Sequence, residues 1–305
     1  MTAYTQVSAN RFKTWLIMFL FAAFITAIVF VFTQALGFQG PSALGFTGIA
    51  LIIAGLMNFF SYYSSDKLVM AISGAKQIQK KNNIELFRIV ENLTIASGLP
   101  MPKIYTIDDT APNAFATGRD PKHASIAFTT GIVTKLNKLE LEGVTAHELS
   151  HVGNYDTRLM TIVSILVGSI ALVADFFLRM VWWGGRSRDD DNNGSGNGLV
   201  MVIALVLAIL SPIIATLIQL AVSRKRELLA DASGALLTRN PDSLAEALLK
   251  ISKDTEPLEV ANKATAHLYI INPFKGQKTA VSAFANLFNT HPPIEERVKA
   301  LRAMQ

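Results

Sequence analysis

The segment His147-Glu148-Leu149-Ser150-His151 decides how the rest of the chain is interpreted. On a helix, positions four apart share a face with Cβ atoms about 5–6 Å apart, so both imidazoles can reach one ion. Glu148 lies about 100° round the helix from His147, which places its carboxylate beside such an ion instead of on it. Zinc lowers the pKa of a bound water to about 7, and a neighbouring carboxylate can then act as general base. The alternative is a surface helix that carries two histidines by chance.

The composition places part of the chain in lipid. Of the 305 residues, 50% are hydrophobic, and the mean hydropathy of +0.34 is too high for an ordinary soluble enzyme. The net charge is +5, but Lys and Arg gather at the ends of apolar runs. This pattern indicates membrane-flanking charge and no nucleic-acid partner. Because the chain has no cysteine, any metal site must use histidine and carboxylate ligands.

Apolar runs predict four transmembrane helices, at 15–33, 44–63, 159–181 and 199–222. The expected fold class is mainly α with a small β-sheet (α+β), in which a transmembrane hairpin splits a zincin-like metalloprotease domain. The expected parts are an N-terminal transmembrane hairpin (1–66), the first part of the catalytic domain (67–158), a second transmembrane hairpin (159–222) and the second part of the catalytic domain (223–305).

Local patterns predict the elements of the first catalytic part. They are a helix at 72–96, three strands at 103–107, 113–117 and 123–129 that form a small meander, and a helix from Lys138 through His151. Asn137 is expected to cap the last helix. Asn154 and Asp156 are expected to organise its end instead of touching the metal.

A catalytic zinc site usually takes a third protein ligand, and Glu227 is the candidate. Asp231 lies four positions on and can hydrogen-bond a ligand imidazole from behind. On local sequence alone, a juxtamembrane helix whose acids offset the basic residues 224–226 is an equal explanation. Two predicted crossings separate His151 from Glu227, so both emerge on one side of the membrane. The positive-inside rule makes this side the cytoplasm and places both termini there.

These features together resemble the HtpX family of bacterial membrane zinc metalloproteases, which are related to the CAAX prenyl endopeptidases. The resemblance covers nearly the whole chain and includes the segment 147–151, Glu227, Asp231, Asn113–Gly118 and a His-Pro near the C-terminus. It implies a gluzincin-type endopeptidase with one Zn²⁺ per chain in the bacterial cytoplasmic membrane. The implied substrates are misfolded or damaged membrane proteins and unfolded polypeptides, degraded in stress-response quality control alongside a membrane AAA-type protease.

The resemblance also implies roles for individual residues. It makes His147, His151 and Glu227 the metal ligands, Glu148 the base and Asp231 a support. The residues Asn113, Ala114, Phe115, Ala116 and Thr117 become an edge strand that binds extended substrate, although an ordinary strand and turn is the simpler interpretation. His291 becomes the donor to the tetrahedral oxyanion, with Arg297 as a supporting charge. A surface histidine ahead of a Pro-capped helix is the alternative for His291.

Two other functions stay open. One is a processing protease of the CAAX type, although those relatives enclose a chamber with more spans than the four expected here. The other is a metal-stabilised membrane scaffold in which the motif is inert. A Glu148→Gln variant that keeps zinc and loses cleavage distinguishes an enzyme from a scaffold.

Overall fold

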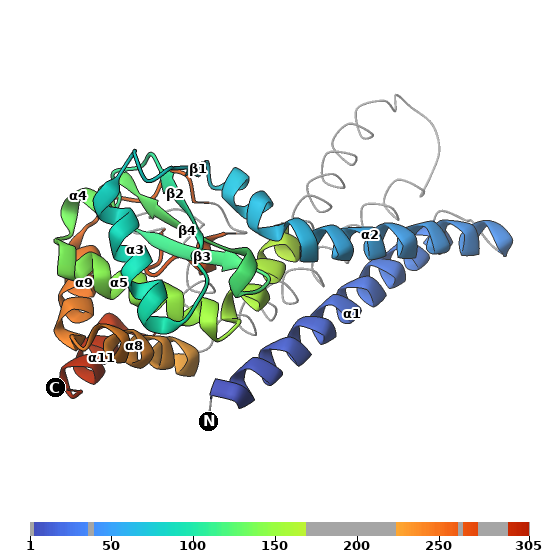
Figure 1. Ribbon diagram of the computed structural model, residues 1–305. Coiled ribbons are helices and arrows are strands. Elements are labelled where there is room, and N and C mark those ends of the chain that lie inside the picture. The colour runs from blue at the N-terminus through green and yellow to red at the C-terminus, as the bar shows by residue number, and fades with distance from the viewer. Residues whose placement is uncertain (1–2, 36–39, 169–223, 262–264, 274–291, 305) are drawn as a thin grey trace.

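The structure is a computed structural model that describes the chain except residues 1–2, 36–39, 169–223, 262–264, 274–291 and 305. Two long helices, α1 (Ala3–Ala35) and α2 (Pro41–Ile72), project from a body of shorter helices around a small sheet (Figure 1). The fold is therefore mainly helical with a small sheet, as expected. The elements of the body are β1 (Lys76–Gln77), α3 (Ile84–Ser97), β2 (Lys103–Ile107), β3 (Ala114–Gly118), η1 (Pro121–His123), β4 (Ala124–Thr129), α4 (Thr130–Lys135), α5 (Lys138–Gly153), α8 (Arg224–Thr238), α9 (Pro241–Lys253), η2 (Ala266–Leu268) and α11 (Ile294–Arg302).

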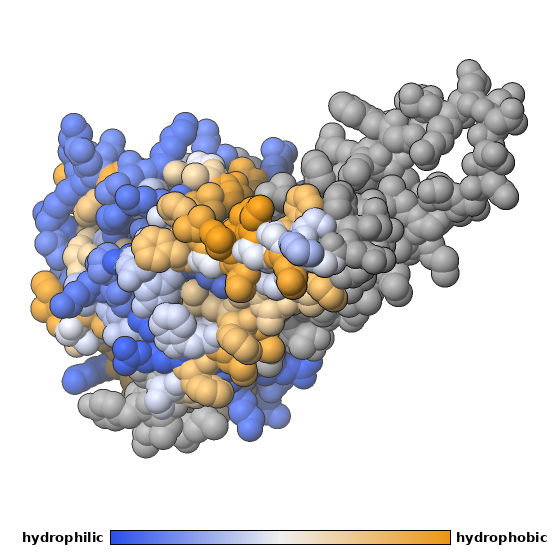
Figure 2. Space-filling view, turned by 90° about the vertical axis from the view of Figure 1, so that its right-hand side faces the viewer, coloured by the Kyte–Doolittle hydropathy of each residue, from blue (hydrophilic) through white to orange (hydrophobic). Residues whose placement is uncertain are grey.

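The projecting helices contain the first two predicted spans. Among the residues described, one helix, Leu44–Ile72, is long and apolar enough by length and composition to cross a membrane. The predicted span 15–33 lies within α1. The third predicted span is described only to residue 168, and the fourth lies outside the described residues. Figure 2 looks at the side from which α1 and α2 project and shows hydrophobic residues gathered over them. Their exposed apolar side chains include Phe19, Leu20, Leu51, Ile52, Phe59 and Phe60.

The predicted meander is wrong, because the sheet is mixed. Its order is β1-β2-β4-β3, with β2 and β4 parallel and β3 and β4 antiparallel. The short connection after β3 turns at Gly118, whose φ is 134°, so β4 pairs back on β3 and then inserts beside β2. The three predicted strands match β2, β3 and β4 to within one residue at each end. Strand order depends on contacts between distant segments, which local patterns do not encode.

The helix predicted at 72–96 is also wrong at its start. Instead, α2 continues to Ile72, and Gly74, with φ of 62°, turns the chain into the short strand β1. Helix α3 begins only where the side chain of Asn83 accepts a hydrogen bond from the backbone N–H of Leu86 at 3.0 Å. It ends as expected at Gly98, which adopts the left-handed conformation.

Helix α5 is the central element of the body. Asn137 and Glu140 form a reciprocal capping box at its start, which confirms the predicted cap. Its apolar residues share one core with α3, the sheet and α9, through side chains that include Val144, Leu149 and Leu244. Segments before residue 159 and after residue 223 therefore fold into a single core, with α5 packed between them.

Candidate metal centre

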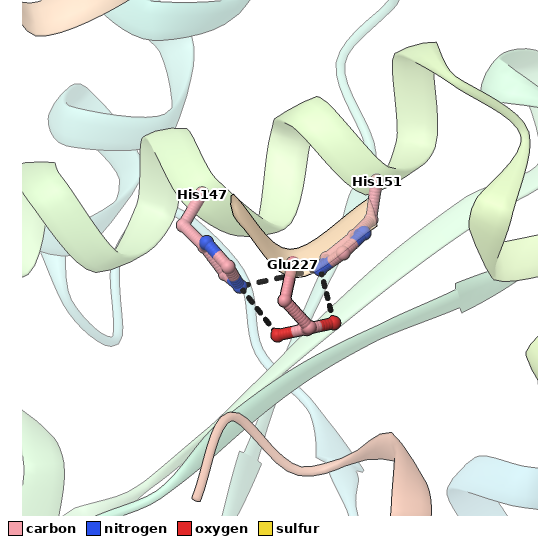
Figure 3. A group of neighbouring side chains, drawn as sticks. All are labelled: His147, His151 and Glu227. Atoms are coloured by element: carbon pink, nitrogen blue, oxygen red, sulfur yellow. Dashed lines mark hydrogen bonds and ion pairs between the residues drawn. The ribbon is translucent and has the colours of Figure 1, made fainter. Parts of the chain in front are cut away.

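Two imidazoles converge on the buried face of α5. His147 and His151 are one helical turn apart, and their Nε2 atoms lie 3.2 Å from each other. Both side chains are buried, at 1% and 5% exposure. Figure 3 shows both rings pointing away from the α5 axis toward Glu227. The helical spacing expected from the sequence thus brings two imidazole nitrogens to one point.

Glu227 joins them from α8. Its Oε1 lies 3.4 Å from Nε2 of His151, and its Oε2 lies 3.7 Å from Nε2 of His147. The three residues offer ligand atoms that lie within 4.8 Å of one another, and all three are buried. Ligand atoms about 2.0–2.1 Å from a tetrahedral zinc are separated by about 3.3 Å, so this donor set fits zinc in both chemistry and spacing.

Close packing of two helices makes this approach possible. A Cβ atom added to Gly234 of α8 would lie 3.0 Å from the backbone nitrogen of His147 and 3.3 Å from the carbonyl carbon of Ala146. A side chain at this position would therefore push α8 away from α5. Glu227 is two turns earlier on α8, so its reach to the imidazoles depends on the same close contact.

Asp231 and Arg297 support His147 from behind. Oδ1 of Asp231 lies 2.9 Å from Nδ1 of His147. Arg297, which is fully buried, donates to both oxygens of Asp231 at 2.8 and 2.7 Å. Its Nη1 also lies 3.9 Å from Oε2 of Glu227. Arg297 therefore fixes the carboxylate that faces the first imidazole.

Asp156 plays the matching part for His151, and the sequence analysis missed it. Its Oδ2 lies 3.0 Å from Nδ1 of His151, and the residue is 1% exposed. Helix α5 ends at Gly153, and Tyr155, with φ of 59°, turns the chain so that Asp156 comes back against the ring. The only feature of the sequence that could have indicated this contact is the position of an Asp five residues after the second histidine. A left-handed tyrosine is not predictable from the sequence pattern.

Burial and neighbouring charges shift the proton affinities of these groups. Burial raises the pKa of Glu148 to about 7, and the Glu227 carboxylate adds to the rise. Burial alone would lower the pKa of His151, but Glu227 and Asp156 raise it well above its ordinary value. Burial lowers the pKa of His147. Although burial acts in the opposite direction, the Arg297 guanidinium lowers the pKa of Asp231 to about 2.

Comparison with known proteins then gives the family. Residues 80–305 match the sequence pattern of the family described as Peptidase family M48. The chain belongs to peptidase family M48. It is 44% identical over 305 residues to a protein named Protease HtpX homolog from Dictyoglomus thermophilum, covering 99% of this chain and 95% of that protein. A protein of the same name from Tropheryma whipplei is also 44% identical, over 99% of this chain and 98% of its own length.

The membership makes this chain a metalloprotease and agrees with the family resemblance found in the sequence. Among solved structures, it is similar to the crystal structure of S. mikatae Ste24p, with a TM-score of 0.48 and 18% identity. That match covers 95% of this chain and 66% of the other.

In this M48 protease the segment expected to bind substrate is the end strand of the sheet, and another segment contacts part of its outer edge. Strand β3 lies at the end of the sheet, as expected of an edge strand, and all five of its residues are buried. The backbone N–H of Ile270 donates to the carbonyl of Ala114 at 3.0 Å, and the Asn113 side chain donates to the carbonyl of Ile271 at 3.0 Å. A hydrogen bond from the backbone of Ala116 reaches Glu148. The strand therefore lies beside the candidate base, but the segment around Ile270 covers part of it.

Of the other residues considered in the sequence, some lie at the candidate metal centre and some lie elsewhere in the fold. Arg297 lies at the site, as described above, and His291 falls outside the described residues. His123 is an exposed partner of Asp120, at 2.7 Å. His267 is buried, with Nε2 3.2 Å from the hydroxyl of Ser164, which agrees with the structural role expected for it. Arg226, expected as a membrane-flanking charge, is instead 4% exposed and lies 3.7 Å from Asp156.

Proposed function

We propose that this M48 metalloprotease is a membrane-anchored zinc endopeptidase that hydrolyses peptide bonds of misfolded or damaged membrane proteins. The observation that carries the proposal is the buried convergence of His147, His151 and Glu227. Glu148 lies beside this group, on the face that the end strand of the sheet covers. A His₂Glu set with a neighbouring carboxylate is a donor set used by hydrolytic zinc enzymes.

Zinc bound at this centre would acidify a water molecule and polarise the carbonyl of the scissile peptide. Glu148 is the general base that takes the proton of the attacking water and passes it to the leaving nitrogen. Burial raises the pKa of Glu148 in the metal-free chain, and a raised pKa makes a carboxylate a better proton acceptor. Asp231 and Asp156 hold the two imidazoles with Nε2 directed inward.

Substrate binds as an added strand on β3, at Asn113–Thr117, and the oxyanion is stabilised by His291 with Arg297 as a supporting charge. Backbone pairing tolerates many side chains, which suits unfolded polypeptides. Because Ile270 now bonds to Ala114, pairing along the full strand requires the segment around Ile270 to withdraw.

The chain crosses the bacterial cytoplasmic membrane four times, with the active site and both termini in the cytoplasm. Support comes from the contact between His151 and Glu227, because residues 3.4 Å apart are separated by an even number of crossings. The 159–222 segment is then a transmembrane hairpin between two parts of one catalytic domain, 67–158 and 223–305, and 1–66 is the first hairpin. Anchoring next to the bilayer favours membrane-protein substrates, which the enzyme degrades alongside a membrane AAA-type protease.

The test is metal analysis and casein cleavage by the full chain in detergent. Wild type should carry about one zinc per chain, His147→Ala and Glu227→Ala should lose most of it, and Glu148→Gln should keep it. Glu148→Gln should lower cleavage at least about 100-fold. The control is Glu142→Gln, a partly buried carboxylate on α5 that pairs with Lys138 and should change neither quantity. Undiminished cleavage by Glu148→Gln would exclude this base, and a metal-free wild type would exclude the centre.

A further inference from the structure

A side chain of the N-terminal projecting helix contacts Asp156, the residue that faces His151 of the candidate metal centre. Asn10, on α1, is 2% exposed. Its amide nitrogen donates to Oδ1 of Asp156 at 2.7 Å and to the backbone carbonyl of Asn154 at 3.1 Å. Its amide oxygen accepts from Nη1 of Arg226 at 3.1 Å. These partners lie more than 140 positions away along the chain, after α5 and at the start of α8.

The partners of Asn10 fix the orientation of its amide. Arg226 can only donate, so it must face the amide oxygen. The carboxylate of Asp156 and the carbonyl of Asn154 can only accept, so they must face the amide nitrogen. No other orientation satisfies these three groups, and all of them are buried or partly buried.

Asp156 uses its two oxygens for different partners. Oδ1 accepts from Asn10, and Oδ2 faces Nδ1 of His151 at 3.0 Å. A hydrogen bond to the outer oxygen restricts rotation of the carboxylate, and the restricted carboxylate sets the ring orientation of His151. The chain Asn10, Asp156 and His151 therefore connects α1 to the Nε2 atom that faces Glu227.

We infer that Asn10 is a positioning residue of the metal centre, so that the N-terminal helix is a component of the site and not only an anchor. The inference rests on the proposed function, because it takes His151 as a zinc ligand. An amide suits this position better than a carboxylate does. A carboxylate at position 10 could still accept from Arg226, but it would meet Asp156 at hydrogen-bond distance without a proton to donate, and these like charges would repel.

The experiment measures zinc affinity of the full chain in detergent by competition with a coloured chelator. Asn10→Ala should raise the zinc dissociation constant about 10-fold, the low end of the range for loss of a group that bonds a ligand directly, because Asn10 acts through Asp156. Asn10→Asp should raise it further. The matched control is Asn58→Ala, another buried asparagine that ties α1 to the body of α2 through a 3.0 Å bond to the carbonyl of Met18. It should leave zinc affinity unchanged.

A double-mutant cycle separates positioning from general packing. If Asn10 acts through Asp156, Asn10→Ala should have little further effect in an Asp156→Ala background. If Asn10→Ala binds zinc with the wild-type dissociation constant, the inference is wrong but the proposed function stands. The same holds if Asn10→Ala weakens zinc binding as much in the Asp156→Ala background as in wild type. A wild-type chain that binds no zinc would overturn the proposed function, and with it the inference.

Discussion

Arg297 donates two hydrogen bonds, at 2.8 and 2.7 Å, to the two oxygens of Asp231, and neither side chain is exposed to solvent. The pair joins α11 to α8 directly behind His147, a proposed metal ligand. Removal of one member of a buried ion pair leaves an uncompensated charge, which costs about 3–5 kcal/mol. Arg297→Ala should therefore lower the free energy of unfolding by about this amount, measured by chemical denaturation in detergent. Arg297→Lys should also destabilise, because an ammonium cannot make the two-pronged contact.

The same helix provides a control for that prediction. Arg302 lies 2.7 Å from Glu246, so its ion pair is as short as that of Arg297, but both partners are about half exposed. Arg302→Ala should cost less than about 1 kcal/mol. Equal effects of the two substitutions would mean that the buried pair contributes no more than a surface one.

The pKa of Glu148 predicts how the stability of the metal-free chain depends on pH. Because the folded state raises this pKa to about 7, it favours the neutral carboxyl. The neutral Glu148 carboxyl stabilises the folded state fully below the unfolded pKa of about 4.5. This contribution to the free energy of unfolding, about 3 kcal/mol, is lost as the pH rises through about 7. Glu148→Gln has no such proton, so it should be more stable than wild type at pH 8 and lose this advantage at pH 5. If the free energies of unfolding of the two proteins change in parallel with pH, the prediction is wrong.

Zinc affinity should rise with pH because the metal displaces a proton from His151. Glu227 and Asp156 raise the pKa of this imidazole well above its ordinary value, so without metal it keeps its proton to a higher pH than a free imidazole does. A ligand nitrogen must be deprotonated, and release of one proton lowers the dissociation constant about tenfold per pH unit. Calorimetry in buffers of different ionisation enthalpy measures the number of protons released. Zinc binding without proton release between pH 6 and 7 would show that His151 is already neutral.

Sequence patterns predicted the parts of this protease that depend on neighbours along the chain. The spacing of His147 and His151, the cap at Asn137 and the bounds of β2 are local features, and the structure agrees with each. Glu227 could be nominated from the sequence, but its distance to the imidazoles depends on how α8 packs against α5. No sequence period specifies such a contact between distant segments.

The contacts that the sequence pattern does not predict have the same physical origin. Nothing local announces the positive φ of Tyr155, so the contact between Asp156 and His151 is not predictable from neighbouring residues. Arg226 looks like one of three membrane-flanking charges, yet it is buried against Asn10 and Asp156 from other parts of the chain. The hydrogen bond that Ala114 of β3 accepts likewise comes from Ile270, more than 150 positions later.

The absence of a side chain at Gly234 allows α8 to approach α5 closely, and we expect metal binding to depend on this approach. An added Cβ would lie 3.0 Å from the backbone nitrogen of His147, and helix backbone cannot move aside as a flexible side chain can. Gly234→Val should therefore separate the helices, cost about 1–3 kcal/mol through overpacking and weaken zinc binding by moving Glu227 away from the imidazoles. Gly153→Ala, at the end of α5, is the control, because its Cβ would only touch the Leu99 side chain at 3.6 Å. The measurements are zinc affinity by chelator competition and unfolding by denaturant. If Gly234→Val binds zinc as tightly as wild type, the position of Glu227 does not depend on this helix contact.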